Sequence, residues 1–153
     1  MLSLSVFLFV LLSVGFLGGL ITQSSLIGWF DLLHKPIGNP PNWIFAPVWT
    51  TLYFMMAVSV WRIWRVRKEK EVRVALGYFA AQFLLNTLWT PAFFGLRNPA
   101  LGLCTIAMLW VFIGLTIQSF SKIEKPAALL LWPYWVWVTY ATYLNTALWW
   151  LNR

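Results

Sequence analysis

The sequence predicts an all-α membrane protein built as a five-helix transmembrane bundle. Of the 153 residues, 61% are hydrophobic and only 10% are charged, a composition far from that of soluble globular domains. The charges lie in short clusters separated by apolar runs of about 20 residues, the length that a helix needs to cross a bilayer. These runs lack the alternation of apolar and polar residues that a transmembrane barrel requires.

The length of the chain predicts a single domain, residues 1–153. The expected helices are residues 4–26, 43–64, 74–94, 100–120 and 127–150. The first of them has neither the basic start nor the small-residue cleavage pattern of a signal peptide, so we expect it to be retained. Gly15 and Gly19 lie four residues apart on it, a spacing that lets another helix approach closely.

The stretch between the first two helices predicts a stiff loop that acts as a lid. Its prolines keep the backbone extended and remove hydrogen-bond donors. The lid residues are His34, Lys35, Pro36, Pro40 and Pro41. Asn42 is expected to cap the second helix, which Trp43 opens. The aromatic side chains that follow would line a pocket beneath this lid.

The net charge of +7 is concentrated in the turn 62–73. In a soluble protein such a charge would suggest a nucleic-acid partner, but in a membrane protein it fits cytoplasmic loops, so we expect no nucleic-acid partner. Five crossings place the two ends of the chain on opposite sides. The positive charge then predicts that the N-terminus and the turn 62–73 are cytoplasmic, in a multi-pass protein of the bacterial cytoplasmic membrane.

The third helix carries a stripe of two amides and two rings. Gln82, Asn86, Trp89 and Phe93 follow one another at intervals of four, three and four residues, so they share one helix face. An amide as deep as Asn86 must find hydrogen-bond partners in hydrocarbon. The sequence leaves two interpretations open, a bond between helices and a contact with a ligand.

The fourth helix is the plainest, and the short turn 95–99 makes it an antiparallel neighbour of the third. In the fifth segment, Pro133 is expected to bend the helix or end its first turn. Trp137, Ala141 and Leu144 share a face there, and the small Ala141 leaves a gap that a planar ligand could enter.

Familiar catalytic sets are missing from the sequence. We find no Ser-His-Asp set, no pair of carboxylates and no cluster of metal ligands, and we expect neither a metal nor a required cofactor. His34 is the only histidine. The single Cys104 excludes a disulfide within the chain.

Three motifs resemble the TspO/MBR family, which includes tryptophan-rich sensory proteins, translocator proteins and the peripheral-type benzodiazepine receptor. They are KPIGNPPNWIFAPVWTTLY from Lys35, LNTLWTPAFFGLRNP from Leu85 and PYWVWVTYATYLN from Pro133. The resemblance implies a five-helix bundle, usually dimeric, that binds porphyrins, haem and synthetic isoquinoline or benzodiazepine-type ligands.

The same resemblance implies a pocket with residues from all five helices. They are Gly19, Thr22, Phe45, Ala46, Trp49, Asn86, Trp89, Leu101, Cys104, Met108, Ala141, Leu144 and Asn145. Two positions depart from the family. Gly38 stands where many relatives carry Trp, which would loosen the lid. No basic residue follows Tyr143 closely enough to complete the sterol pattern of the animal members, so sterol binding is not carried over.

Several functions fit this inventory. A membrane receptor or sensor for tetrapyrroles is favoured, because a porphyrin is a flat apolar disc that stacks on Trp49, Trp89 or Trp137. Lys35 or Arg97 would meet its propionates, or serve only as interfacial charges. An enzyme would have to use the porphyrin itself as photosensitiser, with Trp49 and Trp137 as oxidisable participants in its breakdown.

Two further classes stay open. The alternative is a transporter of porphyrins or a small metabolite, although the sequence shows neither an inverted repeat nor a charge inside a span. The other is a structural protein whose tryptophans only anchor it.

Overall fold

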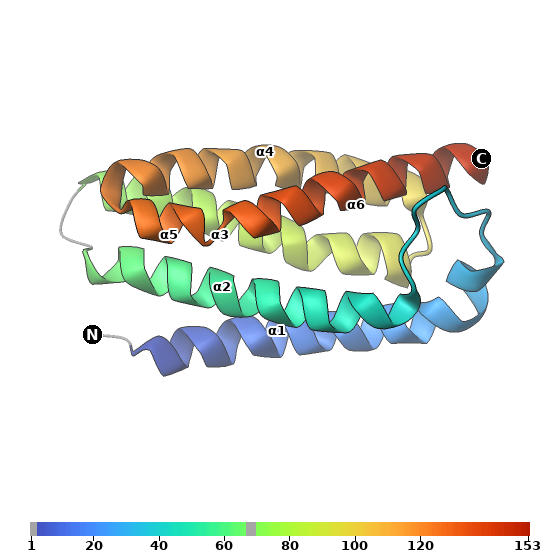
Figure 1. Ribbon diagram of the computed structural model, residues 1–153, viewed down its shortest axis with the longest axis horizontal. Coiled ribbons are helices and arrows are strands. Elements are labelled where there is room, and N and C mark those ends of the chain that lie inside the picture. The colour runs from blue at the N-terminus through green and yellow to red at the C-terminus, as the bar shows by residue number, and fades with distance from the viewer. Residues whose placement is uncertain (1–2, 67–69) are drawn as a thin grey trace.

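The computed structural model describes residues 3–66 and 70–153, and these residues form helices without any strand among them. The long helices are α1 (Leu4–Ser25), α2 (Phe45–Arg65), α3 (Lys70–Thr90), α4 (Pro99–Ile123) and α6 (Trp132–Leu151). A short helix, α5 (Lys125–Leu129), precedes α6. The long helices run side by side in one bundle, so that α1 begins at the end opposite to the one where α6 stops (Figure 1).

The helices pack mainly in sequential pairs. α1 lies against α2, α3 against α4, and α4 against α6. The core between them is filled by fully buried side chains, among them Met56, Ile63, Leu109 and Val138. Aromatic side chains complete the contact between α2 and α6, and the candidate site lies there.

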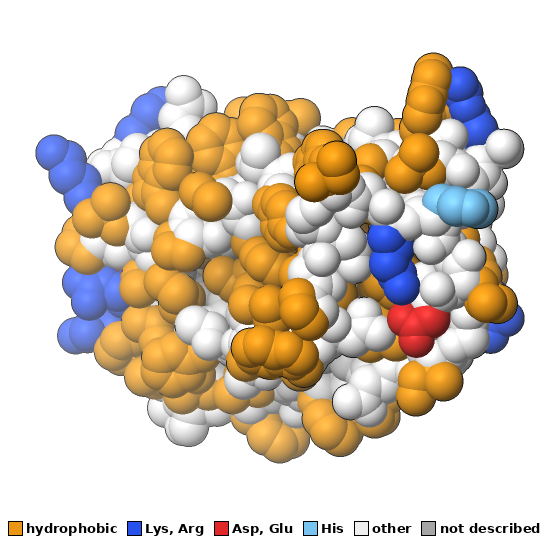
Figure 2. Space-filling view, turned by 45° about the vertical axis from the view of Figure 1, so that its right-hand side comes forward, with side chains coloured by type: hydrophobic (Ala, Val, Ile, Leu, Met, Phe, Trp, Pro, Cys, Tyr) orange, Lys and Arg blue, Asp and Glu red, His pale blue; other side chains and the backbone are white. Residues whose placement is uncertain are grey.

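The chain is an all-α integral membrane protein. Among the described residues, three helical spans are long and apolar enough to cross a bilayer: Leu4–Phe30, Asn42–Arg65 and Pro99–Ile123. α3 and α6 have similar lengths, 21 and 20 residues, but carry the amides, tyrosines and tryptophans that lower mean hydropathy. Most of the visible Lys and Arg side chains lie toward the two ends of the bundle, and hydrophobic side chains cover much of the surface between these ends (Figure 2).

The observed helix ends differ from the predicted ones in several places; α4, for example, ends at Ile123 rather than at residue 120. α1 continues into a π-type segment, η1 (Leu26–Phe30), in which Ile27 and Gly28 leave helical geometry. Gly28 has φ of +100°, a conformation that glycine adopts at little cost. α3 begins at Lys70 rather than at residue 74, and ends in a second π-type segment, η3 (Pro91–Gly95).

The fifth predicted segment is divided between α5 and α6. Pro133 is the second residue of α6, where its missing N–H removes no helical bond, and the chain bends just before it. This confirms the prediction that Pro133 interrupts the segment. Asn42, in contrast, caps no helix. It opens a 3₁₀ turn, η2 (Asn42–Ile44), and its side-chain Nδ2 donates to Oδ1 of Asp31.

The end of the bundle opposite the lid carries most of the positive charge. Arg62 and Arg65 lie in the last turn of α2, and Arg62 forms an ion pair with Glu124. Residues 67–69 of the predicted basic turn lie outside the described residues. The charge distribution is that of the predicted orientation, and the cytoplasmic placement of this end stays a prediction.

Candidate functional site

Four polar side chains form a buried hydrogen-bonded chain across the core. Tyr53 on α2 donates its hydroxyl to Oδ1 of Asn86 on α3. The Asn86 amide donates to the hydroxyl of Tyr134 on α6 at 2.9 Å, and that hydroxyl donates to Oε1 of Gln82 at 2.9 Å. All four side chains are buried. Because both polar atoms of Asn86 have partners within the bundle, the structure supports the interpretation of this amide as a bond between helices.

A second buried polar pair joins α3 to α6 closer to the lid. Trp89 donates its indole N–H to Oδ1 of Asn145 at 3.2 Å, and Nδ2 of Asn145 donates to the carbonyl of Pro99 at 2.7 Å. Gly102 on α4 lies against this pair, since a Cβ there would stand 2.9 Å from that Oδ1 and 2.8 Å from a ring carbon of Phe93. α4 therefore reaches the site through a residue that has no side chain.

Trp49 lies at the centre of the aromatic cluster. Its ring centroid is 6.0 Å from that of Tyr53, 6.1 Å from that of Trp89 and 6.4 Å from that of Tyr134. Such separations fall within the range of favourable aromatic pairs. Trp49 thus connects both buried polar groups to α2, and its half-buried side chain faces the space below the lid.

Two buried donors near the aromatic cluster have no partner among the described residues, Nε2 of Gln82 and the indole N–H of Trp137. The ring of Trp137 is 6.4 Å from that of Phe45 and 5.5 Å from that of Tyr140, and both contacts lie toward the lid. Buried polar groups are nearly always hydrogen-bonded, so this unpaired indole N–H needs an explanation.

The lid is held onto α6 through its main chain. Asn152 bonds His34 twice, accepting from its amide N–H at 2.9 Å and donating to its carbonyl at 3.1 Å. Tyr143 donates to the carbonyl of Ile37 at 3.1 Å, and Tyr140 donates to that of Gly38. These bonds do not depend on the side chains of the lid residues that they hold.

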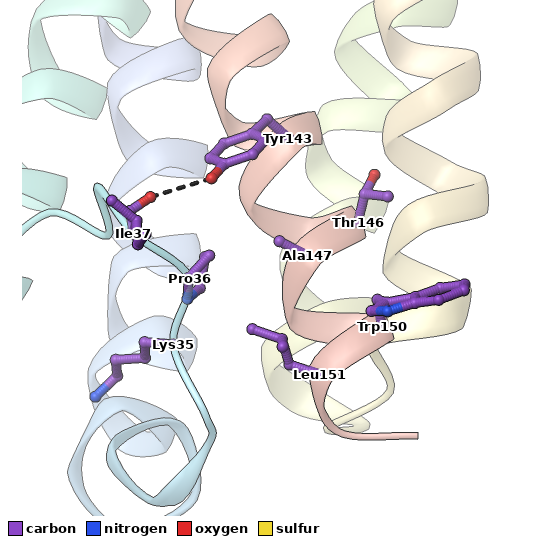
Figure 3. Close-up of a pocket in the computed structure, with 8 residues that line it drawn as sticks. All are labelled: Lys35, Pro36, Ile37, Tyr143, Thr146, Ala147, Trp150 and Leu151. Atoms are coloured by element: carbon purple, nitrogen blue, oxygen red, sulfur yellow. Dashed lines mark hydrogen bonds between the residues drawn. The ribbon is translucent and has the colours of Figure 1, made fainter.

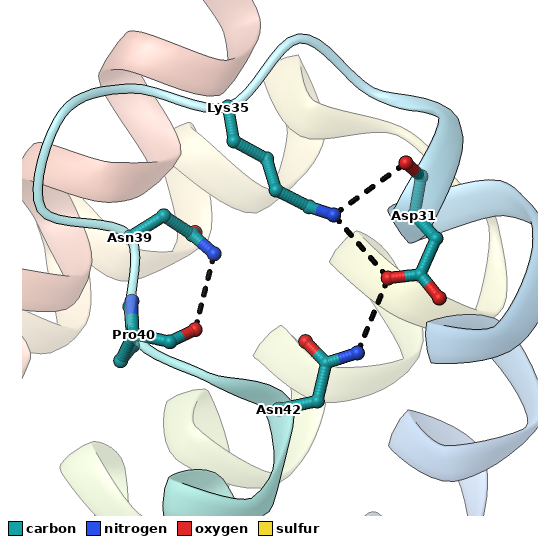
Figure 4. A network of polar contacts seen from close by, with 5 residues as sticks. All are labelled: Asp31, Lys35, Asn39, Pro40 and Asn42. Carbon is teal, nitrogen blue, oxygen red and sulfur yellow. Dashed lines mark hydrogen bonds and ion pairs between the residues drawn. The ribbon is translucent and has the colours of Figure 1, made fainter.

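A polar network fixes the two ends of the lid to each other (Figure 4). Oδ1 of Asp31 accepts from Nδ2 of Asn42 at 3.2 Å and from Nζ of Lys35 at 3.2 Å. The hydrogen bond from Asn42, followed by that from Lys35, lowers the pKa of the Asp31 carboxyl below its ordinary value. Lys35 also lies 5.2 Å from the centre of the Phe30 ring. The carboxylate form of Asp31 therefore supports the closed lid.

Comparison with known proteins identifies the family to which this chain belongs. The sequence profile of the TspO/MBR family matches residues 6–151. The chain belongs to the TspO/MBR family. It is 43% identical over 145 residues to the tryptophan-rich protein TspO of Chlorobaculum tepidum, a match that covers 92% of this chain and 90% of that protein.

Bacterial and animal relatives both match. The chain is 40% identical over 117 residues to the tryptophan-rich sensory protein of Cereibacter sphaeroides, covering 76% of this chain and 72% of that protein. It is also 37% identical over 137 residues to the translocator protein of Bos taurus, covering 88% and 81%. The family resemblance of the three sequence motifs is thereby confirmed.

The TspO/MBR bundle brings together most of the residues expected in the pocket. Asn86, Trp89, Ala141, Leu144 and Asn145 are buried, and Phe45, Trp49 and Trp137 are half-buried beside them. Thr22 is also half-buried, but its hydroxyl donates to the carbonyl of Gly18 in its own helix.

The expected α4 residues lie outside this buried cluster. Leu101, Cys104 and Met108 are exposed on the outer face of α4, while its inner face carries Gly102 and Ile106. The missing side chain of Gly102 lets this inner face of α4 approach Phe93 and Asn145.

Two further residues of the predicted pocket lie outside the buried cluster. Gly19 is exposed, and a Cβ at this position would meet no atom within 4 Å. Ala46 is also exposed. The close approach expected of the glycine pair occurs at Gly15 alone, where a Cβ would stand 2.7 Å from a ring carbon of Tyr53.

Sequence reasoning missed the residues that act through hydroxyl or main-chain contacts. Tyr53 and Tyr134 give Asn86 its partners, and Tyr140, Tyr143 and Asn152 hold the lid. A tyrosine or asparagine near the end of a span is ordinarily assigned to the membrane interface. Only the pairing of distant segments distinguishes these roles. Among the described residues, no group of three His, Cys, Asp or Glu side chains could hold a metal ion.

Proposed function

We propose that this protein is a membrane receptor or sensor that binds a flat tetrapyrrole, protoporphyrin or haem, beneath the lid. The observation that carries the proposal is the buried N–H of Trp137, which lacks a partner among the described residues and whose ring contacts that of Phe45 toward the lid. Nε2 of Gln82 is also buried without a partner among the described residues, but the oxygen of the same amide accepts from Tyr134 within the chain around Asn86. A ligand acceptor placed at Trp137 would remove the penalty of an unpaired donor.

The surroundings of that N–H suit a planar apolar ligand. Phe45 and Trp137 offer ring faces, and Ala141 leaves room one turn along α6. The acidic edge of a porphyrin would point toward the lid end, where Lys35 and Arg97 lie. Lys35 already pairs with Asp31, so a propionate would compete with that carboxylate. The names of the relatives, sensory protein and translocator protein, agree with a receptor.

Tryptophan fluorescence tests the proposal. The purified protein is titrated with protoporphyrin in dim light, and saturable quenching at micromolar ligand is expected. Trp137→Phe and Ala141→Thr should weaken binding, the first by removing the donor and the second by filling the gap. Trp61→Phe is the matched control, because this ring lies against Arg65 at the opposite end of α2. Quenching that does not saturate, or that is equal in all variants, would refute the binding site.

A second activity, light-dependent oxidative breakdown of the bound porphyrin, is favoured by the position of Trp49. Three oxidisable rings, those of Tyr53, Trp89 and Tyr134, have centroids within 6.4 Å of its own. The oxidant would be dioxygen activated by the illuminated porphyrin. Loss of porphyrin absorbance under light should slow in Trp49→Phe and Trp137→Phe, and an unchanged rate would remove the substituted residue from this role. The alternative of a transporter predicts protein-dependent uptake of porphyrin into vesicles.

Three related expectations belong to the same proposal. Isoquinoline and benzodiazepine-type compounds should compete with protoporphyrin, since they are also flat and apolar. A homodimer is expected, and the exposed Gly77 on α3, where a Cβ would meet nothing within 4 Å, fits its interface better than Gly15, which already contacts Tyr53. Crosslinking in membranes would test that face. A protease added outside intact cells should reach the lid end, as the predicted orientation requires.

A further inference from the structure

A groove opens on the side of the bundle between the lid and α6 (Figure 3). Its volume is about 590 Å³. The lid contributes Lys35, Pro36 and Ile37, and α6 contributes Tyr143, Thr146, Ala147, Trp150 and Leu151. None of these α6 residues belongs to the pocket below the lid, so the groove is a separate feature of the molecule.

The groove has apolar side chains that are exposed on the surface of the bundle. Ile37 is 95% exposed, Trp150 58% and Leu151 47%. Side chains of this kind, exposed near the end of a membrane-spanning helix, lie where hydrocarbon meets the lipid headgroups. A molecule dissolved in the membrane would therefore meet the groove without passing through water.

Two tyrosines connect the groove to the candidate site. The Tyr143 ring lines the groove, and its centroid is 6.5 Å from that of Tyr140, in a stacked arrangement. The Tyr140 ring is 5.5 Å from that of Trp137, whose unpaired N–H marks the site. A continuous row of three aromatic rings thus leads from the lipid-facing surface to the ligand position.

The same tyrosines close the way between the lid and α6. Tyr143 donates to the carbonyl of Ile37 and Tyr140 to that of Gly38, so that two single hydrogen bonds hold this part of the lid. Gly38 has φ of +86°, and a Cβ there would meet nothing within 4 Å, so the backbone has space in which to move. Breaking these two hydroxyl bonds would free the lid from α6 at Ile37 and Gly38, while Asn152 still holds it at His34 and the buried chain around Asn86 is undisturbed.

We propose that this groove is the entrance through which a flat, apolar, membrane-dissolved ligand reaches the Trp137 site, with Tyr140 and Tyr143 as its gate. The proposal rests on the proposed function, because it takes the same tetrapyrrole class as occupant. The aromatic lining of the groove continues into the Trp137 site, which favours a ring ligand over a lipid acyl chain as the occupant. It predicts that the residues of the groove control the rates of binding and release while leaving the affinity nearly unchanged.

Stopped-flow quenching with the protein and protoporphyrin IX in the same phosphatidylcholine vesicles tests this. Ala147→Trp, which fills the groove, should slow association and dissociation together, each by about ten-fold. The double variant Tyr140→Phe/Tyr143→Phe should accelerate both rates, by about five-fold for each hydroxyl removed. Val136→Trp is the matched control, because Val136 is 63% exposed on α6 and does not line the groove. It should leave both rates as they are.

The outcomes separate this proposal from the proposed function. Wild-type protein that binds protoporphyrin saturably, with rates unchanged in both the groove and the tyrosine variants, would overturn the entrance and leave the receptor standing. Wild-type protein without saturable binding would overturn both. If Ala147→Trp proves misfolded, the conservative tyrosine variant decides alone, and equal rates there count against the gate.

Discussion

Two layers of the bundle core differ in how far the helices engage their polar side chains. Around Asn86, each of the four polar side chains bonds another across helices, and Nε2 of Gln82 alone among their polar atoms has no partner among the described residues. Around Trp137, a buried indole N–H has no partner among the described residues, and the lid is held at Ile37 and Gly38 by one hydroxyl bond each. The first layer joins the helices, and the second is where we propose that a ligand binds.

This difference teaches that a buried polar residue in such a bundle does not by itself mark a binding site. Asn86 looks as functional as Trp137 in the sequence, yet its bonding capacity is used by Tyr53 and Tyr134. In hydrocarbon, a polar group that is not satisfied by its own protein must be satisfied by something else. The unsatisfied group is therefore the better indicator of function.

The largest expected effect comes from breaking the satisfied layer. Asn86→Leu removes the acceptor of Tyr53 and the donor to Tyr134, and two buried hydroxyls lose a partner, which should cost about 3 kcal/mol of unfolding free energy. Thermal unfolding in detergent measures the loss. Thr87→Val, on the exposed side of the same helix, is the control and should unfold at the wild-type temperature. An equally stable Asn86→Leu would show that the hydrogen-bonded chain does not hold the bundle.

A somewhat smaller effect is expected where α4 meets the site. Gly102→Ala places a methyl group 2.8 Å from the Phe93 ring and 2.9 Å from Asn145, and such overpacking should cost about 1–3 kcal/mol. Gly77→Ala, whose methyl meets open space, should instead be neutral or slightly stabilising, since alanine favours a helix. The same unfolding assay compares the two, and equal stabilities would contradict the close contact at Gly102.

Trp137→Phe should separate binding from stability. Because the indole N–H bonds nothing in the described structure, its removal should change unfolding free energy by less than about 0.5 kcal/mol. Loss of one hydrogen bond to the ligand should weaken protoporphyrin binding about five-fold. Fluorescence titration and thermal unfolding of the same preparation give both values. If Trp137→Phe is destabilised but binds protoporphyrin with unchanged affinity, the Trp137 layer supports the fold and does not bind the ligand.

The smallest effect concerns the lid at low pH. Asn42 and Lys35 lower the pKa of Asp31 in the folded protein. The stabilisation of the lid by these two contacts is therefore fully present above the ordinary pKa of Asp, and it is lost as the pH falls through the lowered pKa. Hydrogen exchange of the Asn39 amide, which bonds the Pro36 carbonyl, should lose protection below about pH 4 after correction for intrinsic exchange. Asp31→Asn should remove this pH dependence. If protection falls equally in the wild-type protein and in Asp31→Asn, Asp31 does not control the stability of the lid.

The sequence predicted the stripe on the third helix, but it did not indicate which face of the fourth helix turns inward. Gln82, Asn86, Trp89 and Phe93 are all buried, as their spacing on one face required. The stripe could be predicted because amides in a membrane span must face the interior of the protein. The α4 segment offered no such signal, since an apolar helix suits lipid on every side. The inward face of α4 carries Gly102, and its importance is visible only from the Phe93 and Asn145 side chains that lie against it.

By itself, the amino-acid sequence determined that this is an all-α membrane protein of the TspO/MBR family, with a rigid loop between its first two helices. Composition, span length and proline positions are properties of the chain alone. Only the tertiary structure decided which polar groups are already engaged, which face of α4 is inward, and that α6 holds the lid through Tyr140, Tyr143 and Asn152. Those outcomes depend on partners up to 118 residues away, and a hydrogen bond is specified only when both of its atoms are in place.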